Sequence, residues 1–247
     1  MKRFLFVAGI ARSGTTALTD LLNAHPGMLI GQERYFNLVS PGRIGEIGPH
    51  LFEAERYFDP VPDETHNFRW REDERHVAFL QEKVRRVEIM GDKVPNYFWH
   101  AERLFAALPR SRMLLVTRHP LRVADSWKRR KVDPEDTVWS AGVRTALAQW
   151  NAGHEEMVKL VRRYGPQMGV VVYEDLFSGA PHPFNRLLSW LDAGAITQHT
   201  LDFHARQTAG WEEREGRDLI LDEEETEMVV NGAKFELRDE LVALARI

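Results

Sequence analysis

Two glycines near the start of the chain bracket residue types that bind phosphate. The segment Gly9-Ile10-Ala11-Arg12-Ser13-Gly14-Thr15-Thr16 follows the apolar run 4–8 and leads into the apolar pattern of residues 17–22. Glycines allow a tight turn, so several backbone N–H groups and the positive end of the next helix can converge on one anion. The sequence therefore predicts a strand, a phosphate-binding loop and a helix, with the N–H groups of Ser13, Gly14, Thr15 and Thr16 facing the anion.

One position in this loop indicates which nucleotide chemistry it serves. A nucleotide-hydrolysing loop reads G-x-x-x-x-G-K-[ST], and its lysine reaches the terminal phosphates. Thr15 stands at the position of that lysine. The loop is therefore expected to bind a nucleotide phosphate, whereas ATP chemistry is disfavoured.

A second group of anion-binding residues follows the apolar run 113–117. Arg118 comes directly after this predicted strand, and Ser126 and Arg130 lie one turn apart on the helix predicted at 121–131. These three side chains could meet a second phosphate, although a structural ion pair is an equal alternative for Arg118 alone. The neighbouring cations on that helix are expected to form a solvated basic face; they are Lys128, Arg129 and Lys131.

The elements around these segments alternate between strand-like and helix-like patterns. Short apolar runs predict strands at 4–8, 28–30, 87–90, 113–117 and 170–173, and amphipathic patterns predict helices at 17–24, 72–86, 101–107, 121–131, 138–164 and 183–191. Gly91-Asp92 is interpreted as a turn, and residues 40–71 as a long loop, either a lid or plain connecting structure. The pattern predicts an α/β protein with a three-layer, P-loop-like fold: a central parallel sheet with helices on both faces. Ligands then bind at the carboxyl ends of the strands.

The whole-chain composition narrows the class of protein. The 247 residues show no break in composition, so one domain over residues 1–247 is expected. A net charge of −4 argues against nucleic-acid binding, and the absence of cysteine excludes disulfides and cysteine-bound metals. The apolar run 4–10 is too short for a membrane span or a signal peptide, so a cytoplasmic location without membrane contact is expected. The acidic run 222–225 is interpreted as a solvated helix face.

In this order the motifs resemble the sulfotransferase family, whose donor is 3′-phosphoadenosine 5′-phosphosulfate (PAPS). Residues 12–16 look like the family's 5′-phosphosulfate loop, and Arg118 with Ser126 looks like its 3′-phosphate motif. Val172-Tyr173-Glu174-Asp175-Leu176 is similar to the segment after the family's core strand. The resemblance covers roughly residues 4–192.

Within the family the greatest likeness is to protein-tyrosine sulfotransferases and their bacterial relatives. Glu33 stands at the spacing at which those enzymes place a catalytic glutamate, and Asp92-Lys93-Val94-Pro95 is similar to their lysine-containing segment. The cytosolic small-molecule branch instead has a histidine two residues after the lysine, where this chain has Pro95. The family's basic, glycine-rich C-terminal loop has no clear counterpart in residues 204–218.

The resemblance implies an enzyme that transfers a sulfuryl group from PAPS to an acceptor hydroxyl and releases 3′-phosphoadenosine 5′-phosphate (PAP), without a metal. Glu33 would be the general base, while Lys93 and Arg12 would neutralise the leaving phosphate. The donor would be held by Arg12, Ser13, Gly14, Thr15, Thr16, Arg118, Ser126, Arg130 and Tyr173. The acceptor stays open among a carbohydrate, a tyrosine and a small alcohol or phenol, and the oligomeric state is left undetermined.

Two alternatives belong to other classes of function. A P-loop nucleotide kinase would need a loop lysine and an acidic magnesium ligand at a strand end, and the chain offers Thr15 and no clear acidic candidate. A non-catalytic nucleotide-binding module would keep the phosphate loops without needing Glu33 and Lys93. Because both residues are present, the enzyme is the preferred hypothesis.

Overall fold

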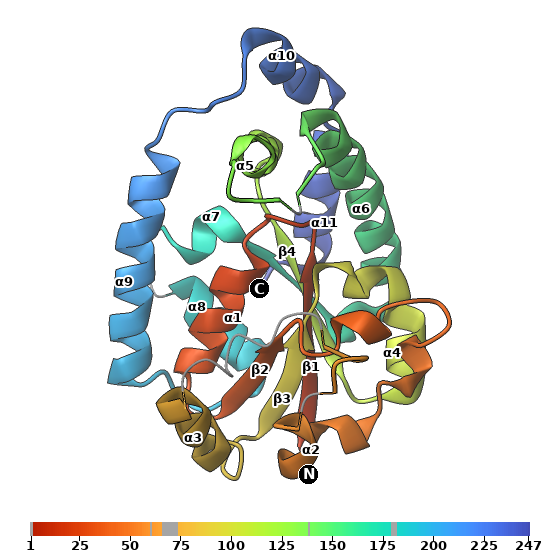
Figure 1. The fold of residues 1–247 in the computed structure, drawn as a ribbon, viewed down its shortest axis with the longest axis vertical. Coiled ribbons are helices and arrows are strands. Elements are labelled where there is room, and N and C mark those ends of the chain that lie inside the picture. The colour runs from red at the N-terminus through yellow and green to blue at the C-terminus, as the bar shows by residue number, and fades with distance from the viewer. Residues whose placement is uncertain (1, 60, 66–73, 138, 179–181) are drawn as a thin grey trace.

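A five-stranded parallel sheet forms the centre of the computed structural model, with the strand order β2-β3-β1-β4-β5 (Figure 1). The structure describes residues 2–59, 61–65, 74–137, 139–178 and 182–247. The strands are β1 (Arg3–Gly9), β2 (Met28–Gln32), β3 (Ile89–Lys93), β4 (Arg112–Thr117) and β5 (Met168–Val172). The predicted α/β fold with a parallel sheet is confirmed.

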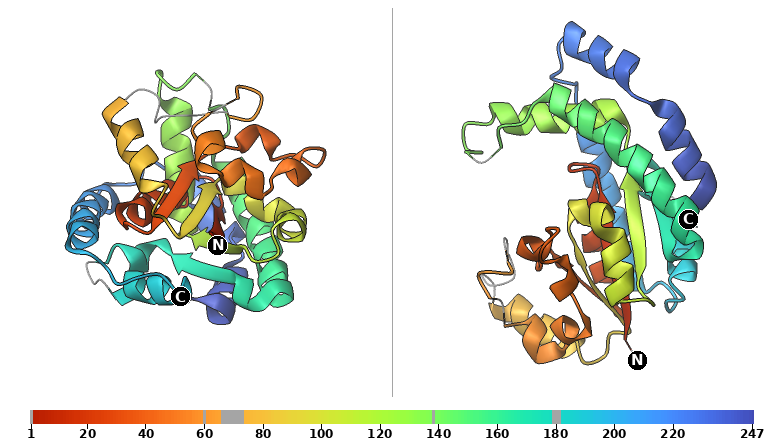
Figure 2. Two further views of the ribbon diagram at one scale, coloured as in Figure 1. Left: turned by 90° about the horizontal axis from the view of Figure 1, so that it is seen from below. Right: turned by 90° about the vertical axis from the view of Figure 1, so that its right-hand side faces the viewer.

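Helices cover both faces of the sheet because the central strands are apolar on both sides. Phe6 and Ala8 of β1 pack into one buried cluster, and Leu5 and Val7 pack into the other. The second cluster includes α1 (Thr15–Ala24), α7 (Tyr173–Leu176), α8 (His182–Trp190) and α9 (Gln198–Glu215). The first includes α4 (Ala101–Ala107), α5 (Pro120–Val132), α6 (Val143–Tyr164) and α11 (Phe235–Ala245). Figure 2 (right) shows α6 lying along this face of the sheet.

Strand β3 is longer than the sequence pattern indicated, and the predicted turn at Gly91-Asp92 is wrong. Both residues are paired within the sheet, with Gly91 opposite Leu5 and Asp92 opposite Phe6. A Cβ atom on Gly91 would lie 1.6 Å from the carbonyl oxygen of Leu5. The glycine therefore marks a close approach of two strands rather than a turn, and Lys93 becomes the last residue of the strand.

The described part of residues 40–71 is packed against the sheet rather than standing over it as a lid. It contains short helices at Ile44–Glu46, Pro49–Phe52 and α2 (Ala54–Tyr57). Phe52 and Tyr57 are buried, and the Phe52 ring lies 6.2 Å from that of Phe6 in β1. Residues 66–71 lie outside the described residues, as does the start of the helix predicted at 72–86, whose described part is α3 (Glu74–Lys83).

The C-terminal third forms helices that the sequence analysis did not assign. After α9 an extended segment, here called the strap (residues 216–222), leads to α10 (Glu223–Gly232) at the far end of the molecule (Figure 1). The acidic run at 222–225 caps α10: Asp222 and Glu225 form a reciprocal capping box. In the described part of the chain no helix has the length and apolar character needed to cross a membrane.

Candidate active site

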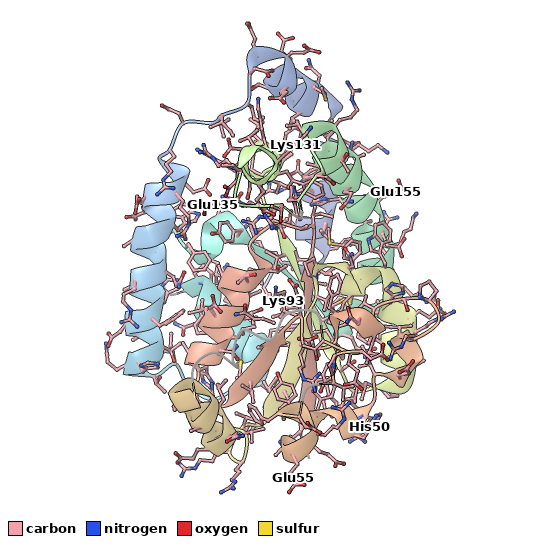
Figure 3. All side chains as sticks on the ribbon, viewed as in Figure 1. His50, Glu55, Lys93, Lys131, Glu135 and Glu155 are labelled. Atoms are coloured by element: carbon pink, nitrogen blue, oxygen red, sulfur yellow. The ribbon has the colours of Figure 1, made fainter. Side chains whose placement is uncertain are left out.

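Each of the five strands delivers one predicted site element to the same edge of the sheet. The strands are parallel, so their carboxyl ends lie together. The glycine loop (residues 9–14) begins at the end of β1, Glu33 follows β2, Lys93 ends β3, Arg118 follows β4 and Tyr173 follows β5. Figure 3 shows Lys93 near the middle of the molecule, at the end of its strand. Segments far apart in the sequence thus converge on one region.

The glycine loop contains three residues with positive φ, among them Arg12 and Gly14. Arg12 has a φ of 74° and Gly14 a φ of 99°. A Cβ atom on Gly14 would lie 2.2 Å from Cδ2 of Tyr173, so the ring occupies the space of a side chain. The indole of Trp127 donates a hydrogen bond of 2.9 Å to the carbonyl oxygen of Ala11. The loop therefore lies fixed between α5 and the start of α7.

Four of the predicted donor-binding residues meet at this loop. The Arg12 Nε donates to the Ser126 hydroxyl at 3.0 Å, and Arg118 Nη1 donates to the Arg12 carbonyl oxygen at 3.3 Å. The Arg118 guanidinium also lies 4.7 Å from the centroid of the Tyr173 ring, a cation–π contact. The structure thus brings Arg12, Ser126, Arg118 and Tyr173 together, with Arg118 just before α5 and Ser126 within it.

Two buried donors in this region favour an anionic ligand. Among the described residues, the Ser13 hydroxyl and Arg118 Nε are buried without a hydrogen-bond partner. Burying such a group unpaired costs about 1–3 kcal/mol. The first turn of α1 holds Thr15 and Thr16. Its backbone N–H groups receive no hydrogen bond from a capping side chain, because the N-cap residue is Gly14. A phosphate oxygen would satisfy donors of this kind, so the residues present fit a phosphorylated ligand.

Glu33 and Lys93 form an ion pair at the ends of β2 and β3. Lys93 Nζ lies 2.9 Å from Glu33 Oε1, with side-chain exposures of 3% for Lys93 and 25% for Glu33. The Glu33 N–H donates to the Lys93 carbonyl oxygen at 2.8 Å, and Glu33 has a φ of 61°. The pair therefore combines a shielded ammonium with a carboxylate that solvent can reach.

Other cations of α5 have partners that sequence analysis did not foresee. Arg130 forms an ion pair with Asp136 and lies over the Trp139 ring, so it contacts the loop after α5 rather than Ser126. Lys128 pairs with Glu225, and Arg129 donates to the carbonyl oxygen of Asp218 at 2.6 Å. Lys128 and Arg129 therefore stay partly exposed, but they are not free on the predicted solvated face, because these side chains hold the strap and α10.

Glu215 lies beside the predicted donor-binding residues, and sequence analysis did not single it out. Its carboxylate forms ion pairs with Arg118 and with Arg122, the latter at 2.9 Å. The strap is also tied to α5 by the Ile220 N–H, which donates to Asp125 at 2.7 Å. Arg118 and Glu215 are 97 positions apart, so no local sequence pattern predicts that they pair. The end of α9 thus places a carboxylate beside Arg118 and Arg122.

A buried histidine supports the backbone at Arg118. His154 Nδ1 donates to the Trp150 carbonyl oxygen at 2.7 Å, so Nε2 accepts from the Thr117 hydroxyl at 2.8 Å. Trp150 in turn donates through its indole N–H to the Arg118 carbonyl oxygen at 3.1 Å. Burial lowers the pKa of His154 to about 4. The neutral ring therefore links β4, α6 and Arg118.

We expect this histidine to make the protein less stable in mild acid. The unfolded chain takes up the proton near the ordinary histidine pKa of about 6.5, whereas the folded chain resists it down to about pH 4. The contribution to stability is therefore complete above pH 6.5 and is lost as the pH falls toward 4. Urea unfolding at pH 7 and pH 5 should show a loss of stability on acidification that is about 2 kcal/mol smaller in His154→Gln than in the wild type. An equal loss in the variant would contradict the assignment.

Comparison with known proteins identifies the class that this fold and site define. The model of the sulfotransferase family matches residues 5–195, so the chain belongs to the sulfotransferase family. The predicted family resemblance and the predicted enzyme class are thereby confirmed. No curated protein matches the sequence significantly.

Three solved structures share the fold at low sequence identity. The sulfotransferase domain from the curacin biosynthetic pathway is 16% identical, with a TM-score of 0.59 over 94% of this chain and 97% of that one. The sulfotransferase domain of the olefin synthase of Synechococcus PCC 7002 is 16% identical, with a TM-score of 0.57 over 98% and 94%. Sulfotransferase STF9 from Mycobacterium avium is 16% identical, with a TM-score of 0.51 over 98% and 75%. At this level of identity, the similarities show a shared fold alone.

Proposed function

We propose that this sulfotransferase moves a sulfuryl group from PAPS to an acceptor hydroxyl, with residues 1–247 acting as one domain. The observation that carries the proposal is the convergence of predicted site residues at the ends of all five strands. The glycine loop, with Thr15 and Thr16 at the start of α1, would bind the 5′ end of the donor. Arg118 and Ser126 would bind its 3′-phosphate, and the Tyr173 ring would support both the loop and Arg118.

The transfer requires a base at the acceptor oxygen and a positive charge at the leaving phosphate oxygen. The bond between the sulfur and the acceptor oxygen forms as the bond between the sulfur and the 5′-phosphate oxygen breaks, and the hydroxyl proton goes to Glu33. Lys93, now paired with Glu33 at 2.9 Å, would turn its ammonium to the leaving phosphate oxygen. Arg12 and the backbone N–H groups at the start of α1 would share that charge. Such fixed donors stabilise developing charge without having to reorganise.

The acceptor is assigned only as a compound that carries a hydroxyl group. Carbohydrates, tyrosine-containing peptides and small alcohols or phenols all provide such a group, and Glu33 could deprotonate any of them during transfer. A screen with PAPS and one panel from each class would separate them, with PAP release as the readout.

The donor assignment is tested by calorimetric titration of the protein with PAP and, separately, with ATP and magnesium. We expect PAP to bind and ATP to bind at least about tenfold more weakly, because the second phosphate cluster has no partner on ATP. Arg118→Ala should weaken PAP binding about 10- to 100-fold, the value of one or two charge-assisted hydrogen bonds.

Arg163→Ala is a matched control, because Arg163 is exposed and pairs with Glu102 at 2.7 Å away from the site. Its PAP affinity should equal that of the wild type. If ATP with magnesium bound and PAP did not, the PAPS assignment would be wrong and a nucleotide kinase would take its place. If PAP bound and no panel released PAP from PAPS, a non-catalytic nucleotide-binding role would be favoured.

A further inference from the structure

A buried carboxylate lies directly beside the Glu33–Lys93 pair. Asp92 is the residue before Lys93 on β3 and has no exposed surface. It accepts hydrogen bonds from the Arg34 N–H at 3.0 Å, the Tyr35 N–H at 3.0 Å and the Tyr97 hydroxyl at 2.8 Å. All three partners are donors, so the ionised carboxylate, which only accepts, matches them.

These contacts hold the backbone immediately after Glu33. Glu33 has a φ of 61°, a left-handed conformation that is unfavourable for a residue other than glycine. Its own N–H is fixed by the Lys93 carbonyl oxygen at 2.8 Å. The next two N–H groups along the chain, those of Arg34 and Tyr35, are the two that Asp92 binds. The left-handed turn at Glu33 is thus held from both sides by adjacent residues of β3.

A glycine makes room for this arrangement. A Cβ atom on Gly31 would lie 2.5 Å from Asp92 Oδ1, so the carboxylate reaches the chain after β2 only because residue 31 has no side chain. The rest of the loop has separate anchors: the Arg34 guanidinium donates to the carbonyl oxygens of Tyr57 at 3.1 Å and Asp59 at 3.0 Å. Asp92 therefore controls the local turn, while other contacts hold the loop that follows.

We propose that Asp92 is a positioning residue for catalysis: by binding the N–H groups of Arg34 and Tyr35 it fixes the turn that directs the Glu33 carboxylate toward Lys93 and the acceptor. This inference rests on the proposed role of Glu33. Displacing a reacting group by about 1 Å can lower a rate about 100-fold, so a loosened turn should affect turnover more than donor binding.

The test compares Asp92→Asn with Tyr97→Phe. Asparagine keeps the volume but turns an NH₂ group toward one of the two backbone donors, whereas Tyr97→Phe removes only the third hydrogen bond. With PAPS and an acceptor from the screen, Asp92→Asn should lower kcat about 10- to 100-fold with the KM for PAPS and the affinity for PAP unchanged. Tyr97→Phe should stay within about threefold of the wild type.

A double-mutant cycle separates positioning from a general structural role. In a Glu33→Gln background, Asp92→Asn should change the residual rate by less than about twofold, because no base remains to be positioned. An undiminished effect in that background, or a parallel loss of PAP affinity, would overturn the proposal. If Glu33→Gln itself kept full activity, the proposed function of Glu33 would fail instead, and the cycle would show which of the two had failed.

A measurement on the wild type keeps the proposal testable if Asp92→Asn does not fold. Hydrogen exchange followed by nuclear magnetic resonance should show the Arg34 and Tyr35 amides protected together, with protection unchanged in Tyr97→Phe. Fast exchange of either amide in the folded wild type would show that Asp92 does not hold the turn.

Discussion

Glu33→Gln is expected to lower turnover by about 10²- to 10⁴-fold, the contribution of a positioned general base. Glutamine keeps the size of the side chain and can still accept a hydrogen bond from Lys93, which lies 2.9 Å from the carboxylate. It cannot take the proton of the acceptor hydroxyl. PAP binding should therefore be nearly unchanged, because the glycine loop and Arg118 lie on other strand ends.

The measurement is PAP release from PAPS with an acceptor from the screen, together with calorimetry of PAP binding. Glu46→Gln is the matched control, since Glu46 is exposed and pairs with Arg43 at 3.0 Å, away from the site. A variant that turns over at the wild-type rate would remove Glu33 from the chemistry. A variant that loses PAP binding would show instead that Glu33 belongs to the donor site.

Gly14→Ala should abolish most of the donor affinity, by about 100-fold or more. Two effects add: residue 14 has a φ of 99°, and a Cβ atom there would lie 2.2 Å and 2.3 Å from two carbons of the Tyr173 ring. A left-handed non-glycine residue costs about 1–3 kcal/mol, and overpacking costs a similar amount. Either the loop or the ring must move, and the ring also supports Arg118 at 4.7 Å.

Titration with PAP and thermal unfolding check this expectation together. Gly45→Ala provides the comparison, because a Cβ atom at Gly45 would meet nothing within 4 Å. The control should bind PAP like the wild type, and Gly14→Ala should also unfold at a lower temperature. Wild-type PAP affinity in Gly14→Ala would mean that the glycine loop does not hold the donor.

The parts of the fold that were predicted correctly depend on local patterns. The strand, glycine loop and helix at residues 4–24 follow from consecutive residues, as does the position of Arg118 after an apolar strand. The turn wrongly predicted at Gly91-Asp92 has a different cause. Glycine and aspartate usually mark turns, but here the glycine admits the Leu5 backbone and the aspartate binds buried N–H groups.

What sequence analysis missed depends on contacts between distant segments. Glu215 gains its place from pairing with Arg118 and Arg122, and neither partner can be inferred from the residues around it. Arg130 is a different case: its partner Asp136 lies only six positions along the chain, and the contact depends on the conformation of the loop after α5. Long-range charge pairing is decided by the assembled fold, so a basic helix alone does not show which of its cations remain free for a ligand.

The carboxylate of Glu215 also affects which anions could bind to Arg118 and Arg122. Arg118 and Arg122 already have an internal counterion, held at the end of α9. A small monovalent anion would have to replace a full carboxylate charge and would gain little by the exchange. A doubly charged phosphate that is tethered to a second binding point would gain enough. Under the proposed function, binding of PAP or PAPS at this place would thus be an ion exchange, in which chloride competes poorly against a bisphosphate that is held at two points.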